Sequence, residues 1–455
     1  MGKVEDTAIV SQVPSEHLPL LSPAAPSTTY LTQEEVVQQA STAPWPGLRK
    51  ALLYLLGVVF ACMLSMAILL LLRMPRPRPP LAWWQKSSFY RLPPTSFPDS
   101  NGDGYGDLAG VSCQLDQLLG LSIQALVLGP ILEGDLANLS SLLPAHGSLE
   151  QLQALANDGR KRGVRILLEL PTLEENLDRI LEDNQTDQHL KGAMQFWQAQ
   201  GVHGFLVPKD PAWLLDAVLN AWSELDSEMQ TDRGEERVLI VLDKSQSCNI
   251  SRWVPSNVIL ACHLLEVESN LSAQALAQRV EEGTLRHPGT PWPGWMVPRG
   301  LPLVADLGEM LGVLLLSLPG VPLLQGGAGS PVPLDNELTK GSSNGHPLAN
   351  LYRSLLALRA NSFALRGVDF VSLPLADHSE DIFAYLRPGS CSDILVFLNL
   401  GSRPCQLNLN QLSIPAPAKV LFSTYPEPQK EISLVLVRLM PHQAVLLQVP
   451  RGYRP

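Results

Sequence analysis

Residues 148–171 read SLEQLQALANDGRKRGVRILLELP, and this stretch decides the fold. Residues 148–162 place apolar side chains at helical spacing, and Gly163 is a typical helix stop. Residues 164–171 form a short apolar run of strand length. A helix that leads directly into a buried strand is half of a βα repeat. The stretch therefore predicts a parallel sheet with helices packed against it.

The same alternation continues on both sides of this stretch. Further strand-like and helical segments lie at 122–131, 193–200, 202–208, 211–225 and 237–243. A helix at 350–362 ends the pattern. Repeated βα units over this length are expected to close as a (β/α)8 TIM barrel, so residues 85–362 are predicted to be an α/β barrel domain.

From residue 363 the pattern changes to short alternating strands separated by turn residues. The segments are DIFAYLRPG, SDILVFLNLG, AKVLFST, ISLVLVRLMP and QAVLLQVP. This pattern is typical of antiparallel sheets. Residues 363–455 are therefore expected to form a small antiparallel β-sandwich domain.

An uncharged apolar run occupies residues 51–72. As a helix these residues would span about 33 Å, enough to cross a bilayer core. A cleaved signal peptide is a poor alternative, because the 50 residues before the run are too many for one. We expect a transmembrane signal anchor, preceded by a mostly disordered cytoplasmic tail at 1–50 and followed by a Pro-rich linker at 73–84.

The orientation of this anchor is predicted from glycosylation sequons. Basic residues flank both ends of the run, so the positive-inside rule does not decide. All four Asn-x-Ser/Thr sequons follow the anchor, at Asn138, Asn184, Asn249 and Asn270. The C-terminal part is therefore expected to be extracellular or lumenal, a type II topology.

The predicted membrane helix carries small residues at Gly57, Ala61 and Ser65, four positions apart. Small residues at this spacing let a second helix approach closely. Chance is the alternative, because such residues are common in membrane helices. If the stripe is used, its partner is another membrane helix.

Charge and cysteines narrow the function classes. The net charge of −11 argues against nucleic-acid binding, which needs a basic surface. The six cysteines show no CxxC spacing, so a zinc site is not predicted. Two bridges are candidates, Cys248 with Cys262 and Cys391 with Cys405. Cys113 falls in a helical segment and is expected to be a buried core cysteine.

Several motifs resemble the α-amylase superfamily. Asp99-Ser-Asn-Gly-Asp-Gly-Tyr-Gly-Asp-Leu-Ala-Gly-Val111 is similar to that superfamily's stretch after the first strand. Residues 201–205 resemble the strand that carries the nucleophile, residues 318–322 the eighth strand, and residues 351–359 the last barrel helix. The resemblance covers residues 89–455 in the right order and implies a barrel followed by a small β domain.

The catalytic positions that the resemblance implies are altered. Pro208 stands at the nucleophile position and Leu206 at that of the supporting arginine. Asp243 ends the fifth strand, where the acid is a glutamate. On the seventh strand, Met296 replaces the third carboxylate and Trp295 the sugar-binding histidine. Glycoside hydrolysis needs two carboxyl groups, so the chain is not expected to be an enzyme.

The anchor, Trp83-Trp84 shortly after it and the altered site together resemble the heavy chain of the heteromeric amino-acid transporters. This implies an accessory subunit that stabilises a multi-spanning light chain and brings it to the plasma membrane. In that family a cysteine just outside the membrane bonds to the light chain. Residues 73–83 contain no cysteine. An inter-chain disulfide is therefore doubtful, and a non-covalent pair is the alternative.

The loop at 99–107 is a candidate calcium site. Asp99, Asn101, Asp103 and Asp107 stand at positions 1, 3, 5 and 9, and Tyr105 at position 7 offers a backbone carbonyl. Hard oxygen ligands at this spacing suit Ca²⁺, although the bidentate glutamate at position 12 is missing. The alternative is a solvated turn. We expect one structural Ca²⁺ and no catalytic cofactor.

Two other functions compete with the accessory subunit. A membrane-anchored α-glucosidase would need Asp210 and Asp243 to act as a displaced catalytic pair. A sugar-binding or adhesion protein would use the old cleft without chemistry, with Trp292 and Trp295 stacking on sugars.

Overall fold

The structure is a computed structural model of the 455-residue chain. It describes residues 32–73, 80–135, 138–172, 186–229, 236–245, 248–265, 272–284, 287, 289–298, 305–327, 347–373, 375, 380–409, 417–426 and 430–451. The chain divides into two units, residues 1–79 and 80–455, and each is described by itself.

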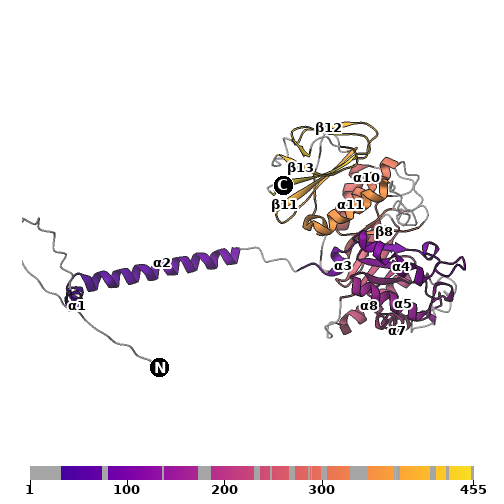
Figure 1. Cartoon of the computed structure of the whole chain (residues 1–455), viewed down its shortest axis with the longest axis horizontal. Helices are drawn as coiled ribbons and strands as arrows, with labels where there is room; N and C mark the ends of the chain where they lie inside the picture. The colour runs from indigo at the N-terminus through magenta and orange to yellow at the C-terminus, as the bar shows by residue number, and fades with distance from the viewer. Residues whose placement is uncertain are drawn as a thin grey trace, which may run out of the picture. The chain divides into compact units, whose positions relative to one another are not determined.

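The first unit contains two helices, α1 (Gln33–Ser41) and α2 (Trp45–Arg73) (Figure 1). Helix α2 has 29 residues, contains the whole of the predicted span and buries no side chain within the unit. It is the one described helix long and apolar enough to cross a membrane. Such a helix has all its backbone hydrogen bonds internal, which is what a bilayer core requires.

The second unit begins with α3 (Trp83–Lys86) and contains a closed barrel of eight parallel strands, as predicted. The strands are β1 (Phe89–Leu92), β2 (Ala125–Leu128), β3 (Arg165–Glu169), β4 (Gly204–Pro208), β5 (Val238–Asp243), β6 (Val258–His263), β7 (Trp292–Met296) and β8 (Val321–Gln325). Strand β8 pairs with β1 and closes the barrel, with Phe89 opposite Leu323.

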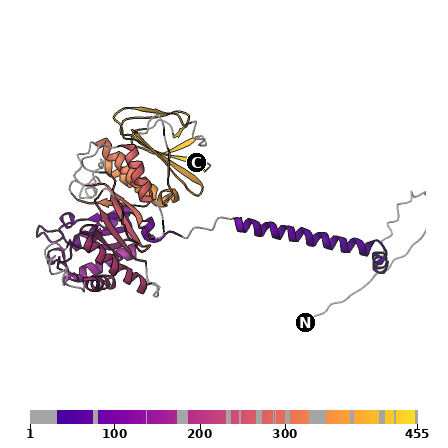
Figure 2. The same ribbon diagram turned by 180° about the vertical axis from the view of Figure 1, so that it is seen from behind.

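Helices surround the barrel (Figures 1 and 2). They are α4 (Leu108–Gly120), α5 (Leu149–Arg162), α7 (Thr186–Ala199), α8 (Ala212–Met229), α9 (Ala273–Thr284), α10 (Ala305–Ser317) and α11 (Pro347–Asn361). Their limits follow local signals. Ser148 caps α5 by accepting a hydrogen bond from the Gln151 N–H, and Gly163 ends it with a positive φ of 85°. Leu152 and Leu155 lie on the buried face between these ends.

The N-terminal end of the barrel is closed by α3. The ring of Trp84 is 4% exposed and packs with Phe89, Leu167 and Leu323 in the apolar cluster inside the barrel. Its ring meets that of Trp292 edge to face, with centroids 5.8 Å apart. Trp83 donates from Nε1 to the carbonyl of Glu236 at 2.6 Å. Trp83 and Trp84, which were predicted to belong to the Pro-rich linker, therefore pack in the barrel core.

The C-terminal domain is an antiparallel sandwich, as expected. After the short helix α12 (Phe363–Arg366), a six-stranded sheet has the order β14-β13-β16-β11-β10-β9, and β12 pairs with β15 in a second sheet. The strands are β9 (Val371–Ser372), β10 (Ile382–Arg387), β11 (Ser392–Asn399), β12 (Cys405–Leu407), β13 (Ala418–Ser423), β14 (Glu431–Ile432), β15 (Val437–Leu439) and β16 (Ala444–Pro450). The predicted strand ISLVLVRLMP is two strands separated by a turn, and β9 and β12 were not predicted.

Both faces of the six-stranded sheet are buried. Leu395 and Phe397 face the small sheet, where they pack with Val437 and Leu439. On the other face, Phe383 and Tyr385 pack in the cluster that includes the barrel helices. The sheet lies beside α10 and α11 in Figures 1 and 2, so the barrel and the β domain share one continuous core.

Two buried arginines lie near the junction of these domains, and one of them, Arg387, connects the two. Arg387 of β10 is fully buried and donates to the carbonyls of Ser317 in α10 and of Ala364 in α12, both at 2.9 Å. Arg359 of α11 donates to the carbonyl of Leu316 at 2.7 Å. Burial lowers the pKa of Arg387 to about 10. These guanidinium groups satisfy carbonyls that the helix ends leave without a partner.

Candidate functional site

Catalytic side chains of (β/α)8 barrels lie at the carboxyl ends of the strands, so this mouth is where a glycosidase site would be. Leu206 of β4, Leu242 of β5 and Met296 of β7 lie there and pack in the apolar cluster inside the barrel. Pro208 is two residues after Leu206 and so lies on the same side of β4. The residues that face the axis at the ends of these strands are therefore apolar.

Asp243 lies on the other side of its strand. Alternate residues of a strand point to the same side, so Asp243 points to the side of Leu239 and Val241. These two residues pack in the outer cluster between the strands and the helices. The Lys209 Nζ is 2.8 Å from one carboxylate oxygen of Asp243. The other oxygen accepts hydrogen bonds from the N–H and hydroxyl of Ser245 at 2.8 and 2.6 Å. This carboxylate is fully buried in a charged pair and does not face the barrel axis.

Asp210, the other member of the proposed displaced pair, lies beyond the end of β4 and is exposed. The two carboxylates thus lie in different environments, one exposed and one buried in an ion pair. A glycosidase pair must flank one bond of the substrate. The described geometry gives no support to the glucosidase alternative.

The two tryptophans suggested for sugar stacking are packing residues. Trp295 is 1% exposed, lies in the outer cluster and donates from Nε1 to the carbonyl of Pro319 at 2.6 Å. Trp292 begins β7 and packs on Trp84 at the opposite end of the barrel from the mouth. Neither ring offers a face to a sugar, so this part of the sugar-binding alternative was wrong.

Sequence reasoning missed a charged pair inside the barrel. Arg91 of β1 donates from Nε and Nη2 to the two carboxylate oxygens of Glu169 of β3, at 2.7 and 2.6 Å. Their parity with Phe89 and Leu167 places both on the interior side of the strands. Both oxygens of the Glu169 carboxylate are thus occupied by one guanidinium group. The pattern Arg-x₇₇-Glu has no local signal, which is why the pair was not predicted.

His263 ends β6 on the interior side of its strand. Burial lowers its pKa, and the nearby Lys244 and Arg279 lower it further, against the opposite effect of Asp243. The imidazole is therefore held neutral at physiological pH. Arg91, Glu169 and Gln325, which is two residues after Leu323 of β8, are polar residues on the same interior side.

The candidate calcium loop is held by its own backbone. The Asp99 carboxylate accepts hydrogen bonds from the N–H groups of Gly104 and Gly102 at 2.8 and 2.6 Å, which hold its pKa below the usual value. Asp103 accepts from the Tyr105 N–H, and Asn101 donates to Asp103 at 2.9 Å. The donor types suit Ca²⁺. However, no three acidic or metal-binding side chains of the described residues are gathered in one group.

Asp107 of this loop has a structural role as well. It is the N-cap of α4 and accepts from the Gly110 N–H at 2.7 Å, while its other oxygen accepts from the Ser100 hydroxyl. Burial raises its pKa, but the hydrogen bonds from Ser100 and Gly110 outweigh this and hold the pKa below the usual value. The calcium site stays a prediction.

Two of the predicted glycosylation sites can be placed. Asn138 and Asn249 are exposed, as a sequon must be to accept a glycan. Asn184 and Asn270 lie outside the described residues. In the first unit, Gly57, Ala61 and Ser65 lie on α2, and the Ser65 hydroxyl donates to the Cys62 carbonyl at 2.9 Å.

The cysteine predictions had mixed outcomes. A disulfide joins Cys248 to Cys262, as suggested. Cys391 and Cys405 are both free thiols, so that suggested bridge was wrong: Cys405 belongs to the two-stranded sheet, whereas Cys391 precedes a strand of the six-stranded sheet. Cys113 is exposed, and the prediction that it is buried was also wrong. The buried face of α4 carries Val111, Leu115 and Leu118.

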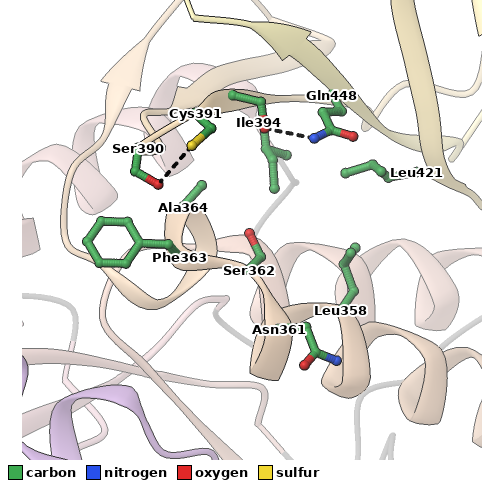
Figure 3. A pocket seen from close by; sticks show the side chains of 12 residues that line it. Leu358, Asn361, Ser362, Phe363, Ala364, Ser390, Cys391, Ile394, Leu421 and Gln448 are labelled. Carbon is green, nitrogen blue, oxygen red and sulfur yellow. Dashed lines mark hydrogen bonds between the residues drawn. The ribbon is translucent and has the colours of Figure 1, made fainter. Parts of the chain in front are cut away.

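A pocket of about 340 Å³ lies between the barrel helices and the β domain, away from the barrel mouth. Figure 3 shows Phe363 and Ala364 of α12 on one side, and Cys391 and Gln448 on the other. Both polar and apolar side chains line it, and nothing in the described residues indicates its occupant.

Comparisons with known proteins agree with both halves of the sequence interpretation. The family description "Solute carrier family 3 member 2 N-terminus" matches residues 20–90. "Alpha amylase, catalytic domain" matches residues 91–172. Among solved structures, a trehalulose synthase MutB from Pseudomonas mesoacidophila has a TM-score of 0.61 with 14% identity, covering 82% of this chain and 100% of that one. That likeness establishes the α-amylase-type fold.

Full-length relatives are transporter subunits. The chain is 28% identical over 483 residues to the amino acid transporter heavy chain SLC3A2 of Oryctolagus cuniculus, with 94% of this chain and 89% of the rabbit protein covered. The heavy chain SLC3A2 of Mus musculus is also 28% identical, with 93% and 89% covered. The chain is therefore homologous to these heavy chains over almost its whole length. With α2, this indicates a membrane-anchored single-pass protein.

Proposed function

We propose that this homologue of the amino acid transporter heavy chains is a non-catalytic accessory subunit. It associates with a multi-spanning light chain that carries the amino acid, and it supports the stability of that light chain and its delivery to the plasma membrane. The homology over 94% of the chain is the observation that carries this proposal. The apolar side chains at the ends of β4, β5 and β7, where the catalytic groups of a glycosidase would lie, support it.

The side chains at the strand ends support the proposed absence of catalysis. Leu206, Pro208 and Met296 cannot gain or lose a proton, and Asp243 faces away from the barrel axis in an ion pair with Lys209. Without a nucleophile and an acid, several orders of magnitude in rate are lost. The purified chain is expected to hydrolyse a chromogenic α-glucoside no faster than buffer. Turnover that disappears in Asp210→Asn would contradict this.

The proposed topology is type II, with the barrel outside the cell. The sequons all follow α2, and the Cys248–Cys262 disulfide suits an oxidising compartment. No cysteine lies between Arg73 and Trp83, so the pair is proposed to be non-covalent. Treatment of intact cells with a glycosidase should shift the chain's mobility. On a non-reducing gel the chain should migrate at its own mass.

Helix α2 offers a contact face for the light chain. Gly57, Ala61 and Ser65 follow one another at intervals of four and expose little side-chain bulk. Leucine at Ala61 would fill the space that a partner helix occupies. Ala67 is six residues further along α2, about 120° around the helix axis from Ala61, so Ala67→Leu makes the same chemical change on another face.

The decisive test is co-purification of the full chain from cells in a mild detergent. A multi-spanning transporter should accompany the wild type and Ala67→Leu, and much less of it should accompany Ala61→Leu. Surface delivery of that transporter should fall when this chain is removed. Recovery of homodimers without a transporter would overturn the proposed function. Equal recovery with both leucine variants would overturn only the proposed contact face.

A further inference from the structure

A small cationic pocket lies at the N-terminal end of the barrel, opposite the mouth. It has a volume of about 130 Å³ and is lined by residues just before β1 and β2, at the start of β3 and at the ends of α11 and α12. Lys86, Arg165 and Arg366 are among the residues that line it, and none of the lining residues carries a carboxylate. Three cations around one small space are unusual in a chain whose net charge is −11.

The arginines of this pocket are held in place by their neighbours. The guanidinium carbon of Arg165 lies 4.5 Å from the ring centroid of Trp83, a cation–π contact. Arg366 donates from Nη2 to the carbonyl of Ala360 in the last turn of α11. Because both side chains are anchored, less conformational entropy is lost when a ligand binds between them.

Each of these arginines also has an unused donor. The Nε atoms of Arg165 and Arg366 are buried and have no hydrogen-bond partner. The ion pairs of the described residues involve neither of them, nor Lys86. A buried N–H without a partner is costly, and the fork of a guanidinium matches two oxygens of a phosphate group. The pocket thus gathers three cations that no described carboxylate neutralises, and this indicates an anionic ligand, for which the guanidinium fork favours an oxyanion.

The positive charge extends behind the pocket. Arg359 is fully buried, and its pKa is lowered to about 9, first by burial and then by Arg387, with Arg366 contributing. The guanidinium groups thus repel one another across the domain junction. An anion beside Arg366 would offset this repulsion, and it would do so more strongly than in water because the site is partly desolvated.

We propose that the pocket of Lys86, Arg165 and Arg366 binds a phosphate group. Its volume equals that of about four water molecules, which is enough for a single phosphate group. Two sources share this chemistry, inorganic phosphate and the phosphomonoester headgroup of an anionic lipid. Gln124, whose Oε1 accepts from the Ser88 N–H, presents its amide group at the same pocket.

The test is thermal unfolding of the full chain in a non-ionic detergent, with inorganic phosphate compared against sodium chloride at the same ionic strength. Phosphate should raise the melting temperature of the wild type beyond the chloride effect. Lys86→Gln and Arg366→Gln should each weaken the phosphate affinity roughly tenfold or more. Lys161→Gln removes the same charge from an exposed residue outside the pocket and should leave the affinity unchanged. Lys86 is itself exposed, so its replacement should not impair folding.

A second arm identifies the source of the phosphate group. The chain is reconstituted in phosphatidylcholine bilayers with or without phosphatidic acid. If the lipid headgroup is the ligand, phosphatidic acid raises the melting temperature and abolishes the response to added phosphate. If free phosphate is the ligand, that response is unchanged. No stabilisation beyond chloride in either arm, or an equal loss of affinity in Lys161→Gln and Lys86→Gln, would overturn the proposal.

Discussion

Replacement of Arg387 by methionine should loosen the connection between the barrel and the β domain. Methionine keeps much of the apolar volume but removes every donor. The Nη1 group donates a hydrogen bond to the carbonyl of Ser317. The two hydrogens of Nη2 are shared among the carbonyls of Ala364, Leu365 and Gly367. About three hydrogen bonds are lost, and each buried acceptor left without a partner costs about 1–3 kcal/mol.

Part of this cost is offset, because a buried cation is itself expensive to desolvate, by several kcal/mol. We therefore expect Arg387→Met to lower the free energy of unfolding by about 3–5 kcal/mol, a large fraction of the 5–15 kcal/mol typical of a whole protein. Arg387→Lys should cost about half as much, because one ammonium group cannot reach both α10 and α12.

Urea unfolding of the full chain in a non-ionic detergent, followed by tryptophan fluorescence, would measure these differences. Arg438→Met is the matched control, since Arg438 is an exposed residue of the same domain and should change stability by less than about 0.5 kcal/mol. If Arg387→Met and Arg438→Met unfold at the same urea concentration, the buried guanidinium does not hold the two domains together.

Three further predictions concern charged groups of the barrel. Glu169→Leu leaves Arg91 buried without its carboxylate and should cost about 3 kcal/mol, most of which the double variant with Arg91→Leu should recover; additive losses in a double-mutant cycle would show that the two are not coupled. Asp107→Ala removes the N-cap of α4 and should cost about 1 kcal/mol at neutral pH. Because the folded-state pKa of Asp107 is lowered, its contribution is present above the unfolded value of about 3.9 and is lost as pH falls through the folded value; Asp107→Asn should keep the cap but lose less stability on acidification, and an unchanged acid profile would refute this. Calcium should raise the melting temperature of the wild type above that in chelator, and by less in Asp103→Asn; no difference in the wild type would mean that the loop's own N–H groups suffice.

The barrel could be predicted because its signals are local. A helical period, a glycine stop and a short apolar run predict each βα unit, as at residues 148–171. The number of such units predicts that the sheet closes into a barrel. The phase of α4 was equally available: the spacing of Val111, Leu115 and Leu118 already places Cys113 on the opposite face.

The side of the strand on which a terminal side chain lies could not be predicted from the sequence. Asp243 is one residue beyond Leu242, and this single step turns the carboxylate from the barrel axis to the outer side. Long-range pairs had no sequence signal at all. Arg91 meets Glu169, and Arg387 reaches Ser317, only because the fold brings together segments that are far apart in the chain.

The closure of the N-terminal end of the barrel by α3 also has a mechanical consequence. Trp84 is the first buried side chain that the structure describes after α2, and Trp83 beside it is hydrogen-bonded to Glu236. Tension along the chain from α2 is therefore transmitted to the second unit through these two tryptophans. A protease that cuts before Trp83 would release a domain in which α3 still closes the N-terminal end of the barrel. A cut after Lys86 would instead remove a piece of the core and leave the barrel open at that end, so the two cleavage sites, only a few residues apart, should have opposite effects on the survival of the released domain.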